Sequence, residues 1–230
     1  MTKTQRLRMT IDITMTILSI ILMGGNYLFP ADLVHEILGV ALFVLWAVHI
    51  TLNRRWYSAL FRGKYNPYRV MQTVINCCIL ICTIFLMISG IILSNHVFTF
   101  LNIQGGLDFA RIAHLLASHW YYLFMSLHIG LHVRMIFGNN GTSTSAGPST
   151  GSGTTRTAIL PSILLAIVCA YGIYAFIARG VWKYLILRQQ FFFFDLERGY
   201  FLFAIDYISI IILFATLSQL LAKSLKKGKM

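Results

Sequence analysis

Two long apolar segments of this chain each carry two histidines fourteen positions apart, and this spacing limits how the chain can fold. The segment VHEILGVALFVLWAVHITLNRRW contains His35 and His49, and the segment ARIAHLLASHWYYLFMSLHIGLHVRM contains His114 and His128. In an α-helix, fourteen residues return to within about 40° of the same direction and rise roughly 21 Å. In a left-handed bundle they make two whole heptads. Each helix should therefore present two imidazoles on one inward face, at two depths.

Apolar runs of this length predict helices that cross a membrane. Hydrophobic residues make up 57% of the 230 residues and charged residues only 11%, and several runs reach the roughly 18 residues expected of a bilayer span. The net charge of +12 comes from basic residues at the ends of these runs. That pattern suits orientation in a bilayer rather than binding to nucleic acid. Membrane lipid is an expected partner, and nucleic acid is not.

We expect six membrane-spanning helices in an all-α integral membrane protein. Their predicted bounds are about 11–29, 33–52, 70–93, 109–137, 158–178 and 200–222. The first run could also be read as a cleavable signal peptide, but it is long and no A-x-A site follows it. We therefore interpret it as the first span.

A tract rich in Gly, Ser and Thr, residues 139–157, interrupts the apolar pattern. It predicts a flexible cytoplasmic linker, and its composition would equally suit an engineered insert. On this interpretation residues 1–138 form a four-helix core, and residues 158–230 form a two-helix peripheral appendage. The appendage contains an outer segment, VWKYLILRQQFFFFDLERG, whose mixed aromatic and basic residues suit the membrane interface.

Basic residues set the expected orientation. With six spans, most of them fall in segments on one side: Lys3, Arg6, Arg8, Arg54, Arg55, Arg62, Lys64, Arg69, Arg134, Arg156, Lys223, Lys226, Lys227 and Lys229. The positive-inside rule then places both termini in the cytoplasm. The second and fourth spans run in the same direction, so His35 should meet His114 near the outer surface. His49 should meet His128 nearer the inner surface.

Two helices that each present one imidazole at two depths could hold two flat cofactors. Two haems, each with a histidine on either face of its iron, fit this arrangement. The chain has no C-x-x-C-H motif, so covalent attachment is not expected and the haems would be b-type. Imidazoles on both faces leave no open position on the iron, which favours electron transfer over oxygen activation. The four cysteines lie within apolar runs and are expected to be small buried hydrophobes.

Two further histidines need separate interpretation. His132 lies one helical turn beyond His128, so it could replace that residue as the inner ligand, bond a haem propionate or line a quinone pocket. We prefer His128 because its spacing from His114 equals that in the other helix. His119 lies about 140° around the helix from His114 and is expected to be a packing or lipid-interface residue.

Three glycines and one carboxylate in the predicted spans have alternative interpretations. Gly25, Gly39 and Gly90 fall in the outer half, where either a flat cofactor or ordinary small-residue helix packing would favour glycine. Asp206 is either an interfacial residue near Arg198, which we slightly prefer, or a membrane carboxylate with a role in proton transfer.

Together these segments resemble the flavinylation-associated cytochrome family, a bacterial and archaeal membrane domain related to the diheme b-type subunits of respiratory enzymes. The resemblance is carried by HEILGVALFVLWAVHITLNRRWY, LFRGKYNPYRV, ISGIILSNHVF, ARIAHLLASHWYYLFMSLHIGLH and FFFFDLERGYFLFAIDY. It implies that His35, His49, His114 and His128 are haem ligands, with His132 a further family position. It also implies location in a bacterial or archaeal cytoplasmic membrane and an extracytoplasmic partner, either flavin-carrying or another redox protein.

The expected function is therefore electron transfer through two haems. Electrons would pass from a quinol or cytoplasmic donor to the extracytoplasmic partner, either in a free-standing cytochrome or in a subunit of a membrane oxidoreductase. One alternative is a haem-bearing anchor that only docks a catalytic subunit. A less favoured alternative is a permease whose histidines bind metal or haem as cargo.

Overall fold

The computed structural model describes residues 2–25, 31–60, 62–137, 154–193 and 199–227. Within these ranges the chain is helical and contains no strand. The helices are α1 (Lys3–Met23), α2 (Asp32–Leu52), α3 (Arg54–Ser58), α4 (Pro67–Leu93), the 3₁₀ helix η2 (Thr99–Leu101), α5 (Leu107–Phe137), α6 (Thr154–Ala178), α7 (Val181–Leu185) and α8 (Gly199–Lys227). The predicted all-α class is confirmed.

Four of the described helices are long and apolar enough to cross a membrane: α2, α4, the part of α6 from Pro161 to Ala178, and α8 from Gly199 to Lys226. The chain is thus a multi-pass membrane protein by length and composition. The other two long helices are more polar, because α1 begins with three basic residues and carries Asp12, and α5 carries four histidines.

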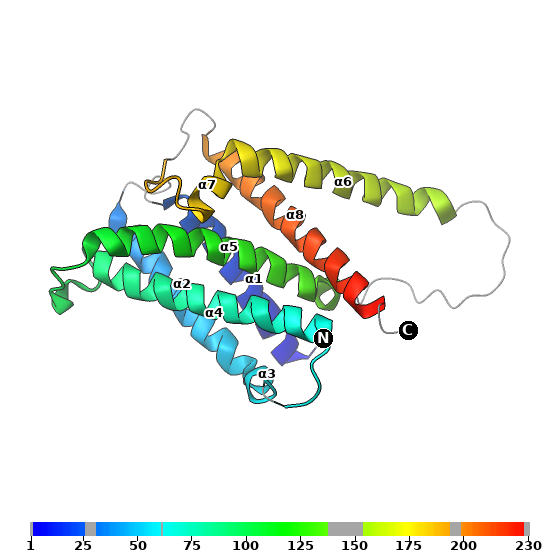
Figure 1. Cartoon of the computed structure of the whole chain (residues 1–230), viewed down its shortest axis with the longest axis horizontal. Coiled ribbons are helices and arrows are strands. Elements are labelled where there is room, and N and C mark those ends of the chain that lie inside the picture. The colour runs from blue at the N-terminus through cyan, green and yellow to red at the C-terminus, as the bar shows by residue number, and fades with distance from the viewer. Residues whose placement is uncertain (1, 26–30, 61, 138–153, 194–198, 228–230) are drawn as a thin grey trace.

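The six long helices run alternately in opposite directions, as Figure 1 shows. The start of α1, the short helix α3 and the end of α8 lie at one end of the molecule, which we call the terminal end. Helices η2 and α7 lie at the opposite end, which we call the η2 end. The predicted inner segments fall at the terminal end, and the predicted outer segments fall at the η2 end.

Helix α8 packs closely against both α5 and α6. A Cβ atom added at Gly130 of α5 would lie 2.2 Å from the backbone oxygen of Ala215 in α8. One added at Gly172 of α6 would lie 2.6 Å from the backbone oxygen of Ser209. These two glycines therefore allow the helix backbones to approach, as small residues do in membrane bundles.

The main hydrophobic core joins the residues predicted as core and appendage. Its buried members are Met23, Tyr121, Tyr122, Met125, Ala175, Val181, Phe203, Tyr207, Ile210 and Ile211. The hydroxyl of Tyr122 also donates to the backbone oxygen of Tyr207. Helices α6, α7 and α8, which the sequence predicts as an appendage, thus share one hydrophobic core with α5.

The predicted linker is only partly described. Residues 139–153 lie outside the described residues, whereas α6 begins at Thr154 rather than after residue 157. The linker prediction was wrong for residues 154–157, because apolar periodicity does not mark the polar first turn of a helix.

A buried ion pair connects the end of α6 to α8. Arg179 Nε donates to Asp206 Oδ2 at 2.7 Å, and the Tyr171 hydroxyl donates to Asp206 Oδ1 at 2.5 Å. Asp206 is fully buried between α6 and α8 and is bonded to Arg179. Arg198, its predicted neighbour, lies outside the described residues.

Candidate functional site

The four histidines at fourteen-residue spacing face one another across α2 and α5. The ring centroids of His35 and His114 are 6.3 Å apart, with an interplanar angle of 61°. Those of His49 and His128 are 6.4 Å apart, with an angle of 74°. The structure thus brings the four residues together in the expected pairs, one toward the η2 end and one toward the terminal end.

The two ring separations suit an ion held between the rings. A metal–imidazole bond of about 2 Å on each side of one ion would place two ring centres roughly 6 Å apart. A direct edge-to-face contact also falls in the range of about 4.5–7 Å. What favours coordination is that the same separation occurs twice, at matched positions on the same two helices.

Three of these rings have a hydrogen-bond partner at Nδ1. His49 Nδ1 lies 2.7 Å from Asp12 Oδ1, and His128 Nδ1 lies 2.8 Å from Asn76 Oδ1. A carboxylate oxygen and an amide oxygen only accept hydrogen bonds, so each Nδ1 carries the proton. The lone pair of each ring is therefore on Nε2, the nitrogen that binds a metal. In His49 this nitrogen accepts from Asn53 Nδ2 at 3.4 Å.

His114 has a hydroxyl partner. Its Nδ1 lies 3.0 Å from Ser89 Oγ, which itself donates to the backbone oxygen of Phe85 at 2.6 Å. Because the hydroxyl proton is already used, Ser89 accepts from His114 Nδ1. The same tautomer results, with the lone pair on Nε2.

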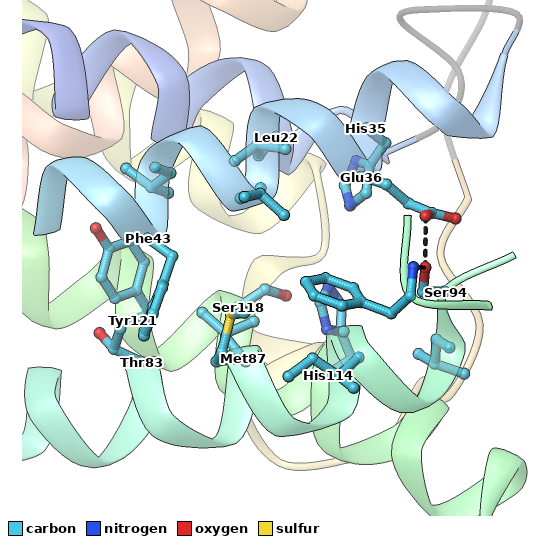
Figure 2. Close-up of a pocket in the computed structure, with 18 of the residues that line it drawn as sticks. Leu22, His35, Glu36, Phe43, Thr83, Met87, Ser94, His114, Ser118 and Tyr121 are labelled. Atoms are coloured by element: carbon cyan, nitrogen blue, oxygen red, sulfur yellow. Dashed lines mark hydrogen bonds between the residues drawn. The ribbon is translucent and has the colours of Figure 1, made fainter. Parts of the chain in front are cut away.

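A cavity of about 320 Å³ lies beside the pair at the η2 end. It is bounded by α1, α2, α4 and α5, and its size falls within the range of roughly 300–1,000 Å³ for ligand sites. Figure 2 shows His35 and His114 on opposite sides of it, with Phe43 and Tyr121 farther along. Most of the lining is apolar, including Leu22 and Met87. A flat, largely apolar cofactor suits such walls.

Two of the three predicted glycines line this cavity. A Cβ atom at Gly39 would meet no atom within 4 Å, and one at Gly90 would lie 3.7 Å from His114 Cε1. Gly25 does not line the cavity. It has a φ of 57° just after α1, a left-handed conformation that itself favours glycine.

Glu36, the residue after His35, organises the opening of the cavity. Its carboxylate accepts from Ser94 Oγ at 2.6 Å, and from the backbone N–H groups of Asn95, His96 and Val97 at 2.8, 3.2 and 2.8 Å. Figure 2 shows the carboxylate of Glu36 turned toward Ser94. The contact ties α2 to the segment that follows α4. Sequence reasoning missed this role, although an acid inside an apolar run was the available signal.

The remaining histidines differ in position. The ring of His132 lies 4.6 Å from that of His128, so both interpretations of the inner ligand stay open. His119 is 1% exposed and stacks on Tyr184 of α7 at 4.3 Å. It is a packing residue rather than one at the lipid interface.

Among the described residues, no group of three or more His, Cys, Asp or Glu side chains could hold a metal ion. A haem iron needs only two protein ligands, since the macrocycle supplies the other four.

No protein-family model, curated protein or solved structure matches this chain.

Proposed function

We propose that this protein transfers electrons across a membrane through two b-type haems, each held between two histidines. His35 and His114 would hold one haem, and His49 and His128 the other. The observation that carries the proposal is the repeated ring separation, 6.3 Å in one pair and 6.4 Å in the other. A bound haem supplies an iron that takes up and releases one electron at a time.

The chain's own residues hold and orient these groups. Ser89, Asn76 and Asp12 fix the rings of His114, His128 and His49 with the lone pair on Nε2, and a haem iron at His49 would replace the Asn53 amide, which lies 3.4 Å from that nitrogen. Gly39 leaves room in the cavity, whose walls are mostly apolar. With an imidazole on either face, the site has no place for a substrate at the metal, which favours electron transfer.

The proposal includes six spans: a four-helix haem-binding bundle of α1, α2, α4 and α5, and two helices outside the haem sites, α6 and α8, of which α8 packs against α5. Helices α1 and α5 are less apolar than the other four, but their polar groups include the candidate ligands and their partners. Polar side chains inside membrane helices commonly face a bundle interior or cofactor. Basic residues concentrate toward the terminal end, which would place both termini in the cytoplasm.

The proposed electron path runs from a quinol or cytoplasmic donor to an extracytoplasmic redox protein, flavin-carrying or of another kind. This part, like membership of the flavinylation-associated cytochrome family, rests on the resemblance of the sequence segments quoted above. His132, close to the inner pair, is the proposed contact for a quinone.

Liposomes test this function. The purified protein would be reconstituted with an oxidant, ferricyanide, trapped inside and a membrane-impermeant reductant outside. We expect the wild-type protein to reduce the trapped ferricyanide at least tenfold faster than empty liposomes. His114→Ala and His128→Ala should reduce the rate to the background, whereas His96→Ala, at an exposed histidine of the η2 end, should not. If haem-loaded protein does not reduce the trapped ferricyanide, electron transfer across the membrane is overturned. The protein would then be a haem-bearing anchor for a catalytic subunit.

A further inference from the structure

The Nδ1 partners of the paired histidines differ in charge. His114 is bonded to a hydroxyl and His128 to a neutral amide, whereas His49 is bonded to the carboxylate of Asp12. The contact between His49 and Asp12 joins α2 to α1 at 2.7 Å, the shortest of the three. The pair at the terminal end therefore has a directly bonded negative charge, and His114 at the η2 end does not.

Among the described residues, Glu36 and Asp32 are the acidic groups that line the cavity beside the pair at the η2 end. Glu36 follows His35, but its carboxylate is bonded to the Ser94 hydroxyl and three backbone N–H groups, and it points toward that segment (Figure 2). Its carboxylate is thus hydrogen-bonded to donors that are not part of a histidine ring. Asp32 is exposed at the start of α2, where solvent screens its charge.

Basic residues near the terminal end act more weakly than Asp12. Arg8, Arg54 and Arg55 are exposed, and Arg8 donates to the backbone oxygen of Leu52 at 2.8 Å. Exposed charges are screened by water and salt. Asp12 is half-exposed, but it acts through a direct hydrogen bond to the ring and not through a field across solvent.

The effect on a bound iron follows from ligand basicity. A carboxylate that accepts the Nδ1 proton makes the imidazole a stronger electron donor at Nε2. A stronger donor stabilises the ferric form relative to the ferrous form and lowers the reduction potential, one of the levers by which proteins tune haem.

We propose that Asp12 is a positioning residue that lowers the reduction potential of the haem at the terminal end below that of the haem at the η2 end. This inference rests on the proposed function and adds a direction of electron flow between the two haems. Transfer of an electron from the haem at the terminal end to the haem at the η2 end would therefore lower its free energy. The chain itself would favour electron flow in this direction.

Potentiometric titration of the purified protein, followed by its α-band absorbance, tests this inference. The wild type should show two midpoints. The lower one should belong to the haem that remains in His114→Ala. Asp12→Asn keeps an oxygen acceptor but removes the charge, so it should raise the lower midpoint and leave the upper one unchanged.

Two further variants complete the design. Asn76→Asp places a carboxylate on His128 and should lower the same midpoint further. Asp108→Asn is the control for net charge, because this carboxylate is 97% exposed and pairs with Arg111 rather than with a histidine, so neither midpoint should move.

The outcomes separate the two proposals. A wild-type protein without haem would overturn the proposed function. The role of Asp12 alone would be overturned if the wild type binds two haems and the midpoint at the terminal end is at or above the other. It would also be overturned if Asp12→Asn leaves that midpoint unchanged. If Asp12→Asn loses that haem, the midpoint of the same haem in Asn76→Asp becomes the test. The inference is overturned if this midpoint does not fall below the wild-type value. Loss of the haem from both variants would also overturn it, because these groups would then govern binding rather than potential.

Discussion

The Ser89 hydroxyl accepts a hydrogen bond from Nδ1 of His114 at 3.0 Å while donating its own proton to the preceding turn of α4. One small side chain thus fixes both the tautomer and the direction of a candidate ligand on the neighbouring helix. Such partners of a ligand matter almost as much as the ligand itself, and their loss typically lowers metal affinity about 10–100-fold.

Ser89→Ala should therefore weaken haem binding at the η2 end by roughly tenfold or more while the haem at the terminal end is retained. The measurement is titration of haem into apoprotein, followed by the Soret absorbance. Thr83→Ala is the matched control, because the Thr83 hydroxyl lines the same cavity but donates only to the backbone oxygen of Ile79. Equal affinities in Ser89→Ala and Thr83→Ala would contradict the role of Ser89.

Gly39→Phe should exclude the haem at the η2 end without unfolding the protein. A Cβ atom at this position points into open space within 4 Å, so a benzyl group there would occupy the cavity between His35 and His114. We expect the haem content of the purified variant to fall from two per chain to one. Val44→Phe adds the same group at a 55% exposed position of α2 and should keep two. Two haems in Gly39→Phe would mean that the cavity is not the haem site.

Arg179→Ala should destabilise the junction of α6 and α8. It removes the guanidinium that donates to Asp206 Oδ2 and leaves the buried carboxylate without this counter-charge, and breaking one side of a buried ion pair costs about 3–5 kcal/mol. Thermal unfolding in detergent should show a melting point lower by several degrees. Arg111→Ala, which breaks an exposed pair with Asp108 at 3.5 Å, should change it little. Similar melting points for both variants would contradict the importance of the buried pair.

Much of the candidate site was predictable because helix periodicity follows from backbone geometry alone. The fourteen-residue spacing of His35 and His49 specifies their common face on any α-helix, whatever surrounds it. The alternation of apolar runs and turns then places α2 and α5 in the same direction. The histidine pairs follow from these two facts.

The hydrogen-bond partners of the histidines were not predictable in the same way. Asp12, Asn76 and Ser89 lie on α1 and α4, and whether they reach a given ring depends on how those helices are rotated and shifted. Spacing within one helix carries no information on that rotation. The pairing of Asp206 with Arg179 was not predicted for the same reason, since proximity in sequence suggested Arg198 instead.

The central claim is that four histidines bind two haems, and the haem-to-protein ratio of single variants tests it most directly. The pyridine haemochrome assay on the purified protein should give two b-type haems per chain for the wild type, with sharp low-spin bands after reduction by dithionite. His35→Ala or His114→Ala should leave only the haem at the terminal end. His49→Ala or His128→Ala should leave only the haem at the η2 end, and the midpoint potential distinguishes the two. A wild-type protein that binds no haem, or unchanged haem content in all four variants, would contradict the account.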